Sequence, residues 1–81
     1  MNNRKILARL LNVYQEQIEK MACEMDGLEY TSNEWQRAAR KHYAERMKRQ
    51  GAKEFAFVLG LISEDEYDLC ISELIERLEA E

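Results

Sequence analysis

Residues 6–28, ILARLLNVYQEQIEKMACEMDGL, repeat apolar side chains at alternating intervals of four and three residues. The repeat comprises Leu7, Leu11, Tyr14, Ile18, Met21, Met25 and Leu28. This spacing indicates an α-helix with a coiled-coil-like seam. Further apolar residues widen the seam into the broader face of a bundle helix: Ile6, Leu10, Val13 and Ala22. With Asn3 as N-cap and Gly27 in a left-handed conformation at the end, a first helix is predicted over residues 4–26.

A second helix is predicted over residues 32–59. Thr31 is followed three residues later by Glu34, which is the spacing of a capping box. Tyr30 and Trp35 occupy the two positions of a hydrophobic staple around this start. The apolar face changes direction near Gly51, so the helix is expected to be either kinked there or covered on several sides in its second half. We favour one long helix that ends at Gly60.

A third helix is predicted over residues 64–80, because Ser63 and Glu66 form another capping-box pattern. Its apolar face consists of Tyr67, Cys70, Ile71, Leu74, Ile75 and Leu78. The short connections between the predicted helices favour antiparallel neighbours. The sequence therefore predicts an all-α fold: an up-down-up three-helix bundle that forms one domain over residues 1–81.

The composition supports this fold. The 81 residues include no proline and only three glycines, and these are the residue types that most often break helices. No apolar stretch approaches the ~18 residues of a membrane-spanning helix, and the N-terminal residues do not resemble a signal peptide. We therefore expect a cytoplasmic protein that does not contact a membrane, in which Cys23 and Cys70 are reduced thiols.

One segment is more apolar than a small monomer requires. FAFVLGLI, residues 55–62, is apolar on nearly all sides of the predicted helix end, which is typical of a segment that is covered on several sides or buried between subunits. A homodimer is therefore expected, with Phe55, Phe57, Val58 and Leu61 as its candidate interface.

Charge is distributed unevenly along the chain. Residues 37–53 hold seven basic residues and one acidic residue, a net charge of +6, whereas residues 64–81 hold eight acidic residues and one basic residue, a net charge of −7. The candidate interaction surface on the second helix consists of Arg37, Arg40, Lys41, Lys48 and Arg49. We favour the interpretation that these charges complement acidic neighbouring helices. The alternative is that they contact a partner.

The sequence shows no pattern of catalytic or metal-binding residues. Cys23, His42 and Cys70 are the only candidate soft metal ligands, and their spacing matches no zinc motif. Cys70 and His42 are expected to pack in the core, and no base can be placed beside a serine or cysteine nucleophile. We therefore predict that the chain is not an enzyme and has no cofactor, metal or small-molecule substrate.

The predicted function is that of a non-catalytic helical interaction or accessory module, as found among small phage and mobile-element proteins, which binds another protein or a second copy of itself. One alternative is a nucleic-acid-associated regulator, in which Arg37, Lys41 and Lys48 share a stripe about 40° wide. The chain's net charge of −4 disfavours that alternative. A second alternative is an inhibitor whose acidic residues 64–81 occupy the basic groove of a nucleic-acid-binding enzyme.

Overall fold

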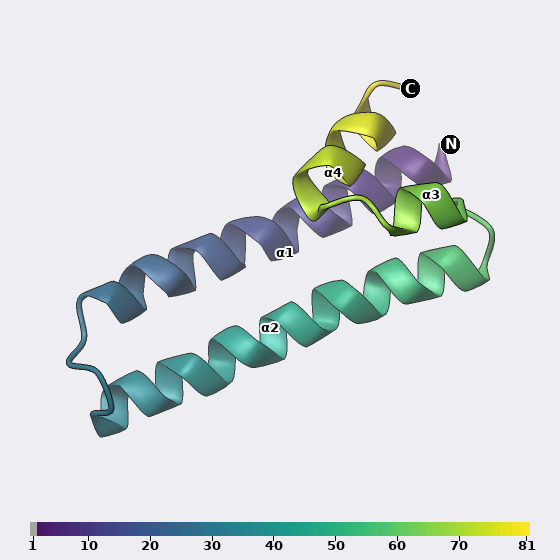
Figure 1. Ribbon diagram of the computed structural model, residues 1–81. Coiled ribbons are helices and arrows are strands. Elements are labelled where there is room, and N and C mark those ends of the chain that lie inside the picture. Colours follow the sequence, from purple (N-terminus) through teal and green to yellow (C-terminus); the bar gives the residue numbers. More distant parts are fainter. Residues whose placement is uncertain (1) are drawn as a thin grey trace.

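The computed structural model describes residues 2–81, which form four helices and no strand. Helix α1 (Asn3–Asp26) and helix α2 (Asn33–Val58) are long and antiparallel, and α3 (Glu64–Tyr67) and α4 (Ile71–Glu79) are short. Figure 1 shows the two long helices side by side, with both short helices beside the N-terminal half of α1. The predicted all-α fold and its first two helices are confirmed.

The core lies at one end of this long hairpin. Its buried side chains are Leu7, Ala8, Leu11, Ala56, Ile62, Leu74, Ile75 and Leu78. Helix α4 contacts α1, and α3 contacts α2, so three layers surround this core. Beyond it, where α1 and α2 approach their connecting loop, only two helices remain, and Ile18 is the buried side chain of α1 there.

Helix α1 buries the predicted seam. Leu7, Leu11 and Ile18 are buried, and the other four seam residues are half-buried. The helix begins one residue earlier than predicted, because the Asn2 side chain accepts hydrogen bonds from the backbone N–H groups of Arg4 and Lys5. The prediction for Gly27 was wrong: its φ of −84° is right-handed.

Helix α2 begins at a different cap from the predicted one. Ser32 Oγ accepts a hydrogen bond from the backbone N–H of Trp35, 3.1 Å away. Thr31 instead has a φ of 69°, so its backbone turns the chain and the predicted Thr31 capping box does not form. The staple contact is present, since the Tyr30 and Trp35 rings meet edge to face at 4.7 Å.

Helix α2 continues through Gly51 without a break. The apolar face changes direction because the environment of the helix changes along its length. Near its C-terminus α2 contacts α3 as well as α1, whereas its first half has only α1 beside it. The turn after α2 depends on Gly60, whose φ of 78° is left-handed; it allows the Leu61 N–H to donate to the Ala56 carbonyl and brings Ile62 into the core.

The prediction of one helix over residues 64–80 was wrong. The Ser63–Glu66 capping box forms as expected, but α3 ends after one turn and Cys70 has an extended backbone. In a continuous helix Tyr67 would point in the same direction as Leu74 and Leu78. The break lets Tyr67 pack on α2, where its ring lies 5.2 Å from that of Phe57, while α4 packs on α1. Cys70 is consequently exposed and was wrongly assigned to the core.

Candidate functional site

The most extensive cluster of charged contacts joins the two ends of the chain. The Arg4 guanidinium donates hydrogen bonds to both carboxylate oxygens of Glu66, to both of Glu81 and to the Leu61 carbonyl. The hydrogen bond from Arg4 lowers the pKa of Glu66 to about 2, against the opposing effect of burial. Glu66 also accepts from the Ser63 N–H. These groups pair their charges and hydrogen bonds with one another. The cluster therefore stabilises the fold and is not a site with a free acid or base.

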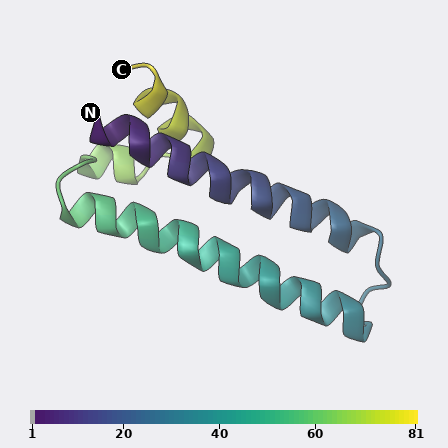
Figure 2. The ribbon, with the colours of Figure 1, turned by 180° about the vertical axis from the view of Figure 1, so that it is seen from behind.

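A groove runs between α1 and α2 on the face of the hairpin that α3 and α4 leave uncovered. Figure 2 shows this side, with α1 passing in front of α4. The part of the groove near the chain ends, here called the apolar section, has a volume of about 290 Å³. It is lined by Asn3, Ile6, Leu7, Leu10, Ala52, Phe55, Ala56, Leu59 and Leu61. None of the described residues that line the apolar section is charged.

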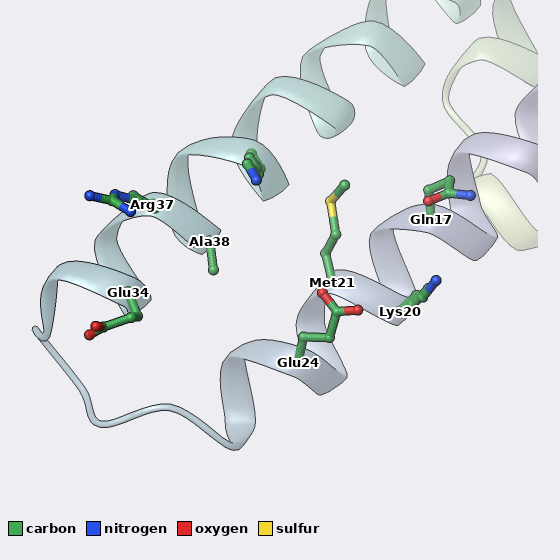
Figure 3. Close-up of a pocket in the computed structure, with 8 residues that line it drawn as sticks. Gln17, Lys20, Met21, Glu24, Glu34, Arg37 and Ala38 are labelled. Carbon is green, nitrogen blue, oxygen red and sulfur yellow. The ribbon is translucent and has the colours of Figure 1, made fainter.

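A second part of the groove lies toward the connecting loop and is here called the charged section, with a volume of about 380 Å³. It is lined by Gln17, Lys20, Met21, Glu24, Glu34, Arg37, Ala38 and Lys41. In Figure 3 the side chains of Met21 and Ala38 point into the space between the two helices. Among the described residues, the charged groups of this section form no ion pair within 4.0 Å.

The two sections lie on one face of the molecule. On α1, each of the four residues that line the charged section lies 14 positions after one that lines the apolar section. On α2, each of the four lies 18 positions before one that lines the apolar section. These intervals correspond to about four and five helical turns, so the side chains return to nearly the same direction. The lining of the groove therefore changes along its length from apolar to charged, while the lining side chains keep nearly the same direction on each helix.

The five basic residues of the candidate interaction surface do not point in one direction. Arg37 and Lys41 line the charged section. Lys48 pairs with Glu45 at 2.9 Å, Arg40 donates to the Gln36 carbonyl, and Arg49 is turned toward α1, where it donates to Gln15. Burial lowers the pKa of Arg49, with a further contribution from the nearby Arg46 charge.

The four residues of the candidate oligomer interface are likewise divided. Phe55 and Leu61 line the apolar section, Phe57 packs against Tyr67, and Val58 is exposed without lining either section of the groove.

The sequence interpretation missed that Ile6, Leu10 and Val13 form an exposed apolar row on α1. Their spacing of four and then three residues is visible in the sequence, where it indicates the broader apolar face of a bundle helix.

The cysteines and the histidine lie apart from any cluster of metal-ligand type. Cys23 and Cys70 are exposed free thiols, and His42 is half-buried on α2. Residues 2–81 contain no group of three or more His, Cys, Asp or Glu side chains arranged to hold a metal ion. Within the same part of the chain, no helix is both long enough and apolar enough to span a membrane.

The chain matches no protein-family model, and comparison with curated proteins and with solved structures gives no significant match. The groove and its lining residues are therefore the features that indicate a function.

Proposed function

We propose that this protein is a non-catalytic interaction module that binds an α-helix in the groove between α1 and α2. The observation that supports this proposal is the exposure of large apolar side chains along one uncovered face. Leu10 is 42% exposed, Val13 54% and Phe55 65%, and Ile6 and Leu59 are also exposed. A row of such side chains on a small protein is typical of a surface that another protein covers.

The groove lies where a further helix of a bundle would pack against α1 and α2. Two antiparallel helices leave a hollow on each side, and α4 fills only one side near the chain ends. A helix in the groove would place apolar side chains at intervals of three and four residues against Leu10 and Phe55. Further along, its charged side chains would meet Lys20, Glu24 and Arg37. The proposed ligand is thus an amphipathic helix whose apolar stripe becomes charged toward one end.

The charge arrangement supports a protein ligand over a nucleic acid. Glu24 and Glu34 line the same section as Arg37 and Lys41, and carboxylates at this position would repel a phosphate backbone. The acidic-inhibitor alternative also receives less support, since Glu66 and Glu81 are engaged by Arg4.

The experiment compares three baits in affinity capture from the cells that make the protein. The baits are the native chain, Leu10→Glu, which places a charge in the apolar section, and Met47→Glu. Met47 is the matched control, because it is 50% exposed on α2 and lines neither section. We expect proteins held by the native chain and by Met47→Glu to be lost from Leu10→Glu. Each should then bind directly in calorimetry with purified components, and equal capture by all three baits would contradict the proposal.

A further inference from the structure

We infer that the groove is occupied by a second copy of this chain, in a parallel homodimer whose two-fold axis runs along the hairpin. This inference rests on the proposed function, because it takes the groove as the binding site and names its occupant. The dimer is a four-helix bundle in which α1 of each copy packs against α2 of the other, with α3 and α4 on the outside.

The apolar section can face a copy of itself. An isologous interface places the same patch on both sides, so a patch without charges brings no like charges together across the axis. Among the described residues, the apolar section has no charged lining residue. Packing Ile6 and Leu10 of each copy against Phe55 and Leu59 of the other removes apolar surface from water on both sides without like-charge contacts.

The long face of the molecule has the area that a stable dimer needs. The molecule measures 43 × 21 × 21 Å, so its long face has a projected area of roughly 900 Å², close to the ~800 Å² that each partner of a stable complex buries. A parallel dimer uses this face along its whole length. An antiparallel dimer that overlaps only at the apolar section uses less than half of it.

The change from apolar to charged along the groove favours the parallel arrangement. A fully overlapped antiparallel dimer would bury Lys20, Arg37 and Lys41 of one copy against the apolar section of the other, which is costly for unpaired charges. A two-fold axis along the hairpin keeps every residue at its own level. Apolar section then meets apolar section. In the charged section, Glu24 of one copy lies within about one helical turn of the level of Arg37 of the other, and Lys20 within about one turn of that of Glu34, so charges of both signs can pair.

Sedimentation equilibrium on the native chain tests the dimer. We expect about twice the 9.6 kDa chain mass at concentrations of about 10 µM and above. Leu10→Glu and Phe55→Glu each place two like charges in the symmetric interface and should raise the dimer dissociation constant by about 100-fold or more. Met47→Glu, outside the groove, should leave it within about threefold, and circular dichroism should show all three variants to be helical. A native chain that stays monomeric at about 100 µM overturns the inference.

Spin labels at the connecting loop test the orientation. Both native cysteines are exposed and are replaced (Cys23→Ser, Cys70→Ser), and a label is attached at Glu29→Cys. A parallel dimer places the two labels within about 30 Å, whereas an antiparallel dimer centred on the apolar section separates them by more than about 50 Å. A long distance overturns the parallel arrangement.

The same variants separate this inference from the proposed function. Suppose that the native chain is monomeric and that Leu10→Glu abolishes its direct binding of another protein. This result contradicts the dimer and supports the groove as a site for another protein. A dimer that Leu10→Glu leaves intact contradicts the inference, and the bait comparison then decides the proposed function independently.

Discussion

Arg4 is the residue through which the N-terminal turn of α1 holds the C-terminal part of the chain. Its guanidinium contacts Glu66 in the first turn of α3, the Leu61 carbonyl in the preceding turn and Glu81 at the chain end. Glu66 is itself buried, so the ion pair lies where water screens it less than at the surface. The hydrogen bonds that Arg4 donates to Glu66, and then those to Glu81, raise the pKa of Arg4 further above its ordinary value, so Arg4 remains charged throughout the accessible pH range.

The pKa of Glu66 predicts a loss of stability in acid. The folded value of about 2 lies below the ordinary value of 4.5, so the ionised carboxylate stabilises the folded state. This contribution is complete above pH 4.5 and is lost as the pH falls from about 4.5 to about 2. At pH 7, Glu66→Gln should lower the free energy of unfolding by about 2 kcal/mol, and the difference from the native chain should shrink toward zero near pH 2. Urea unfolding at several pH values measures this, and a difference independent of pH would contradict it.

Ser32 and Thr31 offer a matched test of the cap that begins α2. Ser32→Ala removes the oxygen that accepts from Trp35 and should destabilise the protein by about 1 kcal/mol. Thr31→Gly should instead stabilise it by about 0.5–1 kcal/mol, because glycine adopts the left-handed backbone of this position without strain. Thermal unfolding of both variants measures the two signs. If Thr31 were the cap, Thr31→Gly would destabilise the protein and Ser32→Ala would be nearly neutral.

At the scale of the helix, Gly51 is the weak point of α2. Glycine in the interior of a helix costs roughly 0.5–1 kcal/mol relative to alanine. A Cβ added at Gly51 has no neighbouring atom within 4 Å, and its backbone is helical. Gly51→Ala should therefore raise the free energy of unfolding by about 0.5–1 kcal/mol.

Gly60→Ala is the control for Gly51→Ala. A Cβ added at Gly60 also has open space around it, but the φ of 78° at this residue disfavours alanine. Gly60→Ala should therefore destabilise the protein. Chemical denaturation of the two variants measures both changes in the free energy of unfolding. Destabilisation by Gly51→Ala would contradict an uninterrupted helix with open space at Gly51.

The elements differ in how far the sequence determines them. Helix α1 is predictable because a period of three and four residues extends over many turns. Helix α2 is predictable from the polar residues at its start and from its lack of proline, although its apolar face changes direction near Gly51. The break between α3 and α4 is not, because residues 68–70 include neither glycine nor proline and the break depends on the contact of Tyr67 with α2. The placement of Ser32 rather than Thr31 as the cap depends on one backbone dihedral angle, which neighbouring residues of similar chemistry do not reveal.

The candidate groove was only partly predictable for the same reason. Ile6, Leu10 and Val13 have the spacing of a buried face, and the sequence predicts a third bundle helix over residues 64–80. A nine-residue α4 on the opposite side cannot cover them. Phe55 was assigned to an interface from the local excess of apolar residues. Its position across from Ile6 depends on the register between α1 and α2, which neither helix specifies alone.

At the scale of the whole molecule, the elongated shape predicts uneven stability. The radius of gyration is 14.6 Å, compared with about 12 Å for a compact domain of this length. The core lies at one end, and the half of the hairpin nearest the connecting loop has two helices and little buried side-chain area. Its amides should open by local unfolding more readily than those of the core. Hydrogen exchange measured by mass spectrometry should be faster over residues 17–41 than over residues 7–11 and 74–78, and uniform protection would contradict this.

The concentration dependence of the same exchange connects local stability to assembly. In a parallel dimer the charged section is covered as well as the apolar section, so association protects residues 17–41 even though they lie far from the core. Raising the concentration from about 1 µM to about 100 µM should slow their exchange, because association stabilises the bound form by mass action. The Leu10→Glu variant should show the fast exchange at both concentrations. If protection rises only over the apolar section, the copies overlap at one end and the loop half of each hairpin remains a free two-helix arm.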